Sequence, residues 1–444
     1  MTSHTVDFSL LSPSDPDRSD PIVGFRDRFH IPRKTDGSPV IYLCGNSLGL
    51  QPKSAREYVL QEMDDWAAYG VEGHFRGKHP WMPYHELLTE QTARLVGAVP
   101  QEVVVMNSLT VNLHLMLVSF YRPTKERHKI VIEANAFPSD RYAVESQIRY
   151  QGAGIATSLV ELQPRDGEAT LRTEDILDYI GREGSSVAVI MLGGVNYYSG
   201  QAFDMASITR AGRAAGCVVG FDLAHAAGNL VLKLHDWGAD FAVWCSYKYL
   251  NAGPGGTAGC FVHERHARRT DLPRFTGWWG HNKQTRFLMG PRFEPIPGAE
   301  GWQLSNPAIL SLAALRASLD IFDEVGMEPL RTKSVKLTSY LESLLNHQER
   351  KSFDIITPPD PAQRGAQLSI MVHDNGRKVF DELNESGIIC DWREPDVIRV
   401  APVPLYNSYS DVYEFARKLR GITETGHRRP ETGKEERANG DQEV

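Results

Sequence analysis

Strand-like and helix-like segments alternate through the middle of the chain, and this alternation constrains the fold most strongly. Apolar runs rich in β-branched or aromatic residues predict strands at 128–134, 186–195, 217–222 and 241–246. Helical patterns lie between them at 138–151 and 205–216. Strands that alternate with helices form a mostly parallel sheet with helices on both faces. We therefore predict an α/β fold.

The pattern changes after residue 310. Helical periodicity covers 308–326 and 330–348, and weaker strands follow at 366–372 and 396–403. These segments predict a smaller C-terminal α/β domain, joined in space by part of the N-terminal segment. Both ends of the chain are polar and lack apolar periodicity, which predicts disorder there.

Charge and cysteine content exclude several functional classes. Lys and Arg number 48 against 56 acidic residues, a formal net charge of -8 that argues against general affinity for nucleic acid. The five cysteines are odd in number and have no C-x-x-C spacing, so we expect reduced thiols and no metal site. The N-terminus does not resemble a signal peptide, and no apolar run approaches the ~18 residues that span a bilayer. We expect a cytoplasmic protein that binds neither nucleic acid nor membrane.

Polar residues follow several predicted strands, where ligands of open α/β sheets bind. Asp222 ends one strand, Lys248 follows the next, and Thr110 is close to the start of an apolar helix. Phe137 and His225 are near two further strand ends. Pyridoxal 5′-phosphate needs a lysine amine, a carboxylate at its pyridine nitrogen, an aromatic cover and phosphate donors. Lys248, Asp222, Phe137 and Thr110 can meet those needs in that order.

Each of these residues also has an ordinary structural interpretation. A lysine at a strand end is usually a surface cation, a strand-end aspartate usually belongs to a turn, and His225 can be a buried structural histidine. The run "NAGPGG" at 251–256 lacks the Gly-Lys-Ser/Thr of a phosphate loop. We interpret its glycines as a tight path past the cofactor.

Seven strings along the chain together resemble the kynureninases, which are pyridoxal-phosphate enzymes of fold type I. They are "YLCGNSLGLQP", "SLTVNLHL", "FPSD", "FDLAHAAGN", "CSYKYLNAGPGG", "GWWGH" and "RVAPVPLYNS", in the order and spacing of that family. The resemblance covers about residues 25 to 420 and implies a large domain with a seven-stranded, mostly parallel sheet. It also implies this division: a flexible 1–24, an N-terminal segment 25–80, a large domain 81–307, a small domain 308–421 and a disordered tail 422–444.

The resemblance assigns roles residue by residue. Lys248 is the Schiff-base lysine, Asp222 the partner of the pyridine nitrogen, and Tyr247 a phosphate contact and proton donor. The other cofactor contacts that it implies are Leu109, Thr110, Phe137, Pro138, Ser139, Asp140, His225, Trp278 and Asn306, the last two completing the site in part across a dimer interface. Arg399 matches the arginine that binds the substrate carboxylate, and His74, Asn46 and Ser47 match the region around the aromatic end of the substrate.

The activity implied is hydrolytic Cβ–Cγ cleavage of L-kynurenine or 3-hydroxy-L-kynurenine by a homodimer. The products are L-alanine and anthranilate or 3-hydroxyanthranilate, in tryptophan catabolism and NAD biosynthesis. Gly193 stands where many relatives have a serine near the cofactor, and Asn196 also departs from the expected pattern. A cysteine desulfurase or class V aminotransferase on the same fold is the alternative, and a binding protein that keeps the fold without the cofactor is a second one.

Overall fold

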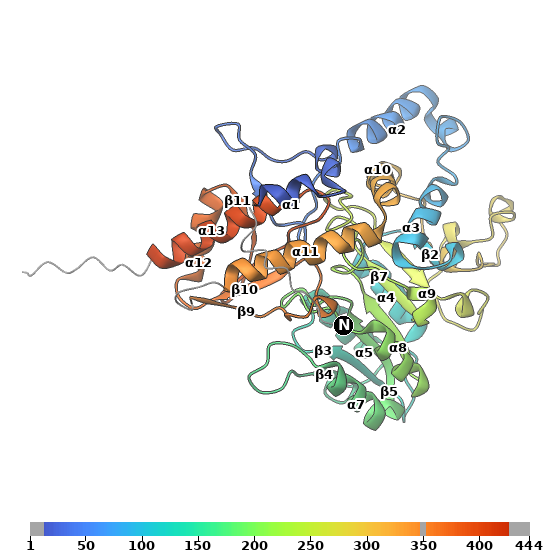
Figure 1. The fold of residues 1–444 in the computed structure, drawn as a ribbon. Coiled ribbons are helices and arrows are strands. Elements are labelled where there is room, and N and C mark those ends of the chain that lie inside the picture. Colours follow the sequence, from blue (N-terminus) through green and yellow to red (C-terminus); the bar gives the residue numbers. More distant parts are fainter. Residues whose placement is uncertain (1–12, 347–351, 426–444) are drawn as a thin grey trace, which may run out of the picture.

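The computed structural model describes residues 13–346 and 352–425, which form sheets of seven, four and two strands, and helices cover the two larger sheets (Figure 1). The predicted disorder of residues 1–12 and 426–444 lies outside the described residues. Helix α13 continues to Thr425, past the predicted start of the tail at 422. The predicted domain boundaries at 80 and 307 stay predictions.

The elements follow the local sequence patterns closely. The strands of the large sheet are β2 (Val103–Val105), β3 (Lys129–Glu133), β4 (Leu159–Leu162), β5 (Val187–Gly193), β6 (Val218–Asp222), β7 (Phe241–Trp244) and β8 (Gly259–Val262). The remaining strands are β1 (Ile41–Tyr42), β9 (Phe353–Ile355), β10 (Leu368–Val372), β11 (Ile388–Ile389), β12 (Asp391–Arg393) and β13 (Val397–Val400). The helices are α1 (Ser14–Arg18), α2 (Ala55–Tyr69), α3 (Thr89–Val96), α4 (Leu109–Phe120), α5 (Pro138–Tyr150), α6 (Ile155–Ser158), α7 (Thr173–Glu183), α8 (Met205–Ala214), α9 (Leu234–Trp237), α10 (Ile309–Val325), α11 (Met327–Asn346), α12 (Gly376–Glu385) and α13 (Tyr409–Thr425).

The large sheet confirms the predicted seven-stranded, mostly parallel architecture. Its order is β2-β8-β7-β6-β5-β3-β4, and only β8 runs antiparallel to its neighbours. Alternate residues of β3 face opposite sides: Val131 packs in the core cluster that includes α7, α8 and α10, while Ile130 and Ile132 pack with α4 and α5. Because both faces are buried, these strands are continuous apolar runs.

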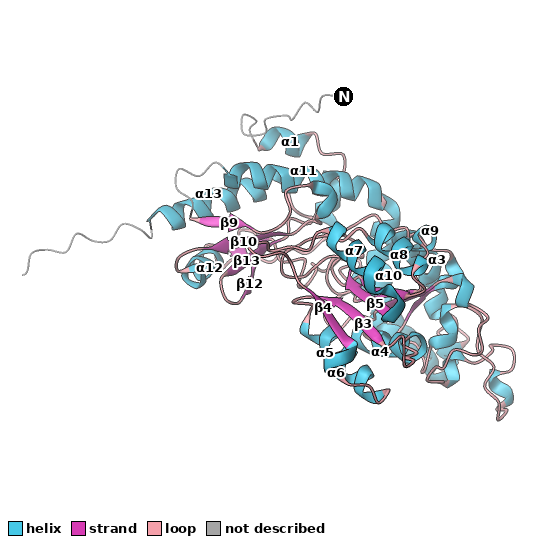
Figure 2. Ribbon diagram, turned by 90° about the horizontal axis from the view of Figure 1, so that it is seen from below, coloured by secondary structure: helices cyan, strands magenta, loops and turns pink. Residues whose placement is uncertain are grey.

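The small sheet is antiparallel, in the order β12-β13-β10-β9, and packs against α11, α12 and α13 (Figure 2). The N-terminal segment joins this half of the molecule, because β1 pairs in parallel with β11 and Leu43 packs in the small-sheet core. Asp17 of α1 accepts hydrogen bonds from the backbone N–H groups of Tyr409 and Ser410, which start α13.

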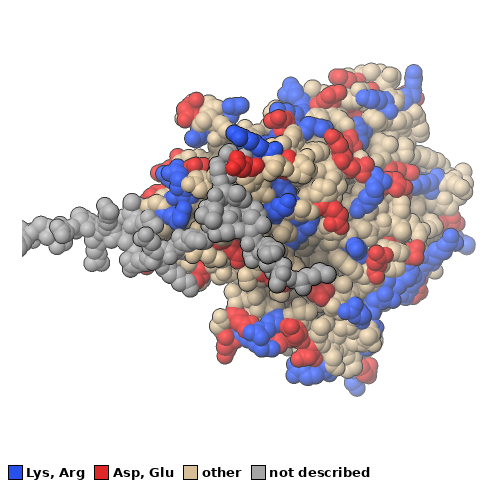
Figure 3. Space-filling model, viewed as in Figure 1, with Lys and Arg blue, Asp and Glu red and all other residues tan. Residues whose placement is uncertain are grey.

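Charges are mixed on the molecular surface. On the face seen in Figure 3, Lys and Arg side chains are interspersed with Asp and Glu over most of the area. In the described part of the chain, no helix combines the length and apolar character needed to cross a membrane.

Candidate active site

The carboxyl ends of parallel strands β3, β5 and β6, together with the segment after β7, surround a cavity. Glu133, Gly193 and Asp222 are the last residues of their strands, and Lys248 follows β7. The lining residues are Leu109, Thr110, Glu133, Phe137, Ser139, Asp140, Gly193, Val195, Tyr197, Asp222, Ala224, His225, Tyr247 and Lys248. The cavity therefore lies where the sequence predicts a ligand.

Lys248 projects its amine into this cavity next to a buried imidazole. The Nζ atom of Lys248 lies 3.0 Å from Nε2 of His225 and 5.8 Å from the centre of the Phe137 ring. Burial, and then the charge of Lys248, lower the pKa of His225 well below its usual range. Lys248 is the one lysine or arginine among the described residues that line the cavity.

Asp222 and Asp140 form a pair of buried carboxyl groups in the same cavity. Oδ1 of Asp222 accepts a hydrogen bond of 2.7 Å from the backbone N–H of Ala224. Burial and the negative charge of Asp222 raise the pKa of Asp140 well above its usual range, and a side-chain hydrogen bond joins the two groups. Burial raises the pKa of Asp222 as well, but less than that of Asp140, so Asp140 is the member of the pair that holds the proton and donates it in a hydrogen bond to Asp222.

Two helices point their N-termini at the cavity. Helix α4 begins at Leu109 after Ser108, which makes no side-chain capping hydrogen bond, and α5 begins at Pro138 after Phe137. Oγ1 of Thr110 lies 2.8 Å from Oγ of Ser139 and joins the two first turns. Free N–H groups, two hydroxyls and two helix dipoles make this end of the cavity suitable for a phosphate.

Tyr247 and Phe137 supply aromatic surface to the cavity wall. Burial, together with Cys245, raises the pKa of Tyr247, so its hydroxyl stays protonated and can donate a hydrogen bond. Phe137 is 45% exposed, and its ring meets that of Tyr197 edge to face at 5.2 Å. An exposed ring at the cavity mouth is available to cover a planar ligand.

Arg399 does not line the cavity. Its guanidinium is buried, with Nη2 2.5 Å from Oδ2 of Asp391 and Nη1 donating to the carbonyl oxygen of Tyr197 at 2.7 Å. Its Nε has no hydrogen-bond partner among the described residues. Because Tyr197 lines the cavity, Arg399 lies directly behind the cavity wall.

Pro138, which starts α5, does not line the cavity, and five other residues that the family resemblance singled out also lie outside the lining. Asn46 is buried and donates from Nδ2 to Oε1 of Gln367 at 2.9 Å. Nδ1 of His74 lies 3.0 Å from the carbonyl oxygen of Val71. The side chain of Trp278 is 42% exposed, that of Ser47 is partly buried and that of Asn306 is exposed. In a single chain, none of these five takes part in the cavity.

The cavity contains residues that sequence reasoning missed. Glu133, Val195, Tyr197 and Ala224 line it, and Glu133 is buried. Glu133 ends β3 and is one residue before the end of the predicted strand 128–134, so the rule that placed Asp222 at a strand end applied to Glu133 as well.

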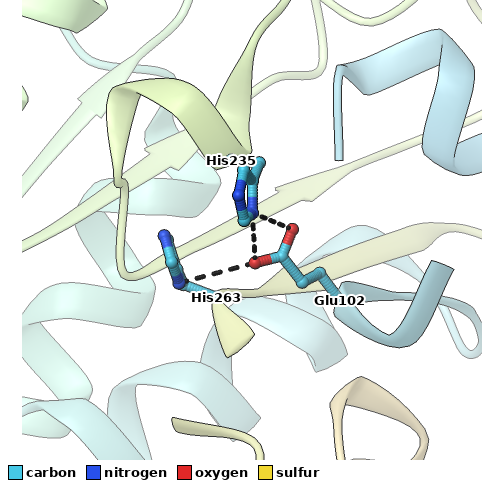
Figure 4. A group of neighbouring side chains, drawn as sticks. All are labelled: Glu102, His235 and His263. Atoms are coloured by element: carbon cyan, nitrogen blue, oxygen red, sulfur yellow. Dashed lines mark hydrogen bonds and ion pairs between the residues drawn. The ribbon is translucent and has the colours of Figure 1, made fainter. Parts of the chain in front are cut away.

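A group of Glu102, His235 and His263 lies outside the cavity (Figure 4). The Oε1 atom of Glu102 accepts from the backbone N–H of Glu264 at 2.8 Å, and Oε2 accepts from that of Val99 at 3.0 Å. Nδ1 of His235 lies 3.0 Å from Oε1 and 3.1 Å from Oε2. Protein N–H groups already satisfy this carboxylate, so we assign the group a structural role.

Comparisons with known proteins give a consistent result. Residues 330–419 match the family model described as the kynureninase C-terminal domain. The chain is 67% identical to a kynureninase of Koribacter versatilis and 63% identical to one of Myxococcus xanthus, in each case over 91% of this chain and 95% of the relative. A kynureninase of Christiangramia forsetii is 53% identical over 91% of this chain and 96% of its own length.

Solved structures with the same fold are more distant in sequence. The cysteine desulfurase CsdA from Escherichia coli superposes with a TM-score of 0.72 at 17% identity, covering 94% of this chain and 99% of the other. A cystine C–S lyase mutant with glycine covalently linked to its PLP cofactor gives a TM-score of 0.71 at 16% identity, covering 86% of this chain and 96% of the other. These similarities confirm the fold type.

Proposed function

The chain belongs to the kynureninase family, and on this premise we propose that it binds pyridoxal 5′-phosphate in the cavity and cleaves kynurenines hydrolytically. The observation that carries the proposal is that Lys248 and Asp222 face one cavity between two helix N-termini. The substrates are L-kynurenine or 3-hydroxy-L-kynurenine, and the products are L-alanine and the corresponding anthranilate.

The cavity residues fit this cofactor. The buried Oδ1 of Asp140 and Nδ1 of His225 have no hydrogen-bond partner among the described residues, so the cavity presents polar atoms that await a ligand. Lys248 offers the amine for the aldehyde, and the first turns of α4 and α5 offer N–H groups for the phosphate. Asp222 offers a carboxylate for the pyridine nitrogen.

Bound pyridoxal phosphate supplies an electron sink for charge that develops at the substrate Cα. Asp222 supports this by holding a proton at the pyridine nitrogen, and Asp140 donates to Asp222 and fixes its orientation. Lys248 is the base positioned to move the Cα proton, with His225 at 3.0 Å fixing its amine. Tyr247, whose pKa is raised, is the proton donor to the departing alanyl fragment.

Arg399 is the proposed partner of the substrate carboxylate. Its Nε has no partner among the described residues, and Nη1 and Nη2 each carry a second hydrogen, so donors for a two-point clamp remain beside the bonds to Tyr197 and Asp391. We propose that the substrate carboxylate takes these donors, with Asn46, Ser47 and His74 near the aromatic end of the substrate.

A homodimer completes the site in this proposal. Trp278 and Asn306 lie outside the cavity of their own chain, so a second copy has to bring them to it. Large apolar side chains are exposed on α2 and the segment after it and also around residue 288: Trp66, Val71, Phe75, Phe287, Leu288 and Met289. Burying such surface against a second copy stabilises a dimer.

The desulfurase alternative needs a reactive cysteine thiolate. All five cysteines are described, none forms a disulfide, and burial raises the pKa of each thiol, that of the most exposed one, Cys44, to about 12. These inert thiols also support a reducing, cytoplasmic location, as we propose.

A direct assay tests the proposal. The purified protein loaded with pyridoxal phosphate is incubated with L-kynurenine, 3-hydroxy-L-kynurenine or L-cysteine, and alanine and the aromatic product are quantified. We expect alanine and anthranilate in equal amounts from kynurenine. Release of alanine from cysteine alone would favour the desulfurase alternative, and kcat/KM for the two kynurenines identifies the preferred substrate.

A further inference from the structure

We propose that Glu133 is a positioning residue of the cofactor site: its carboxyl group holds the end of β5 at Gly193 and places a third acidic group beside the Asp140–Asp222 pair. This inference rests on the proposed cofactor site. It deepens that proposal because neither the sequence motifs nor the family resemblance assigns Glu133 a role.

The position of Glu133 is fixed by contacts with the neighbouring strand. Glu133 ends β3, is 5% exposed, and lines the cavity. Its Oε2 and Oε1 atoms accept hydrogen bonds of 3.2 and 3.3 Å from the backbone N–H of Gly193, and the side chain of Asn196 also bonds to it. The carboxyl group thus spans the end of β5, where the chain leaves the sheet beside the cavity.

Gly193 leaves room for this carboxyl group. A Cβ atom at 193 would lie 3.0 Å from Oε1 of Glu133, which is tighter than ordinary van der Waals contact. The sequence predicts a missing side-chain contact at Gly193, where many relatives have serine. In the structure the polar side chain at this corner of the cavity is Glu133, reached from the adjacent strand.

The segment that Glu133 holds also reaches the proposed substrate arginine. Asn196 stabilises the turn after β5 by accepting from the backbone N–H groups of Tyr198 and Ser199 at 3.0 Å each. Tyr197 lies between Asn196 and Tyr198 in this turn, and its ring packs on that of Phe137. Its backbone carbonyl oxygen accepts a hydrogen bond from Arg399. A shift of β5 at Gly193 therefore displaces both the cofactor cover and the partner of Arg399.

The charge of Glu133 acts on the same acids that face the cofactor. Asp222 faces it from β6 and Asp140 from α5, while Lys248 is the cation that offsets these two acids. From β5 and the turn after it, Glu133 meets only the N–H of Gly193 and the amide of Asn196. Burial raises the pKa of Glu133 to about 7. Its ionisation near neutral pH therefore adds negative charge around Asp222 and strengthens the hold on a protonated pyridine nitrogen.

The test measures cofactor binding, separately from turnover. The dissociation constant of pyridoxal phosphate is determined on apoprotein at pH 6 and pH 8.5 for the native chain and for Glu133→Gln. Glutamine keeps an acceptor for the Gly193 N–H but carries no charge. We expect near-native affinity at pH 6 and about tenfold weaker binding than the native chain at pH 8.5, as one nearby charge predicts.

The matched control is Glu161→Gln, the same change on the adjacent strand β4, where Glu161 is paired with Arg141 at 2.8 Å outside the cavity. This control should match the native chain at both pH values. A second variant, Gly193→Ser, crowds the carboxyl group. We expect it to weaken binding in the native background and to do so less in a Glu133→Ala background, where the crowded side chain is absent.

The outcomes separate this proposal from the proposed function. Identical affinities of Glu133→Gln and the native chain at both pH values would overturn the role of Glu133, as would additive effects of Gly193→Ser. If Glu133→Gln weakens cofactor binding at pH 8.5 and not at pH 6 while the native chain leaves kynurenine intact, the proposed substrate is contradicted and the role of Glu133 is supported. Failure of the native chain to bind pyridoxal phosphate overturns both.

Discussion

Lys248 takes its chemical character from the residues that surround it in the cavity. A neutral His225 contacts its amine, and the acidic groups Asp222 and Asp140 lie in the same cavity. A charged imidazole at 3.0 Å would repel the amine, whereas the neutral one can accept a hydrogen bond from it. At the scale of single residues, burial of the histidine thus gives the Lys248 amine a neutral hydrogen-bond partner that holds it in the cavity.

The first prediction at this scale concerns covalent attachment of the cofactor. Lys248→Ala should abolish the borohydride-stable adduct of pyridoxal phosphate, which mass spectrometry of the reduced protein detects. Cleavage of kynurenine should fall by at least about 10³-fold, because both the nucleophile and the base are lost. Lys233→Ala, at an exposed lysine before α9, is the control and should keep the adduct. An adduct that persists at native yield in Lys248→Ala would place the reactive lysine elsewhere.

The second prediction concerns Arg399 and its buried pairing with Asp391. Arg399→Ala should raise KM for kynurenine by about 10²-fold or more, since a buried charged donor to the substrate carboxylate contributes about 2–5 kcal/mol. Arg399→Lys should recover little of this loss, because lysine lacks the two-point geometry of a guanidinium. Steady-state kinetics distinguish KM from kcat. Arg393→Ala is the control: Arg393 also pairs with Asp391, at 2.9 Å, so an equal rise in KM there would indicate general damage to the ion pair.

At the scale of elements, side chains at the ends of helices and strands form a structural cluster as well as the active site. Glu102 ends the short 3-10 helix Pro100–Glu102, His235 lies in α9, and His263 follows β8. Their side chains meet although they come from three separate segments (Figure 4). The fully buried carboxylate of Glu102 therefore ties the β2–β8 edge of the sheet to α9.

This arrangement predicts a pH-dependent stability. The hydrogen bond to Glu102 raises the pKa of His235, so the protonated imidazole stabilises the fold below its unfolded pKa of about 6.5 and loses this effect as pH rises through the folded value. Glu102→Gln should lower the thermal unfolding temperature at every pH, since one of two buried acceptors is lost at a cost of about 1–3 kcal/mol. The deficit should be larger at pH 5.5 than at pH 8.5. His235→Gln should remove that difference, and a deficit independent of pH would refute the pairing.

Local patterns were sufficient to predict most elements, and long-range contacts explain what they missed. The predicted strand 128–134 and the predicted helix 138–151 are confirmed as β3 and α5. Both were predictable because the apolar residues of each segment follow the pattern typical of its element type. The Asp391–Arg399 pair depends on the register between β12 and β13, and the β1–β11 pairing joins distant parts of the chain. Neither follows from local periodicity.

The glycine run after Lys248 shows the same limit. Its path past the cofactor stays a prediction: in the single chain, Gly253 and Gly255 line a separate apolar groove that the N-terminal segment and α10 also border. Both glycines have left-handed backbone angles, with φ of 84° and 70°, which explains the residue type by turn geometry.

At the scale of the whole molecule, the exposed apolar segments and the site residues missing from the cavity have a common explanation. Helix α2 and the loops around residue 288 belong to the half of the molecule away from α12 and α13 (Figure 1). Trp278 donates from its indole N–H to the carbonyl oxygen of Arg286 at 3.1 Å and packs on Phe287, so it belongs to the same exposed apolar surface. In the homodimer that we propose, a two-fold contact through this surface brings Trp278 and Asn306 of each copy towards the cavity of the other.

Subunit complementation tests this dimer. Lys248→Ala and Asn306→Ala homodimers should both be impaired, because each of their cavities lacks one required side chain. In a heterodimer of the two variants, one cavity combines the native Lys248 of one copy with the native Asn306 of the other, and the second cavity lacks both. Random mixing gives heterodimers in about half of the molecules, so activity should rise to about a quarter of the native value. Activity equal to the mean of the two homodimers would mean that Asn306 serves the cavity of its own chain. Mixing Lys248→Ala with Lys233→Ala should give activity in proportion to the intact cavities, which checks that subunits exchange without harm.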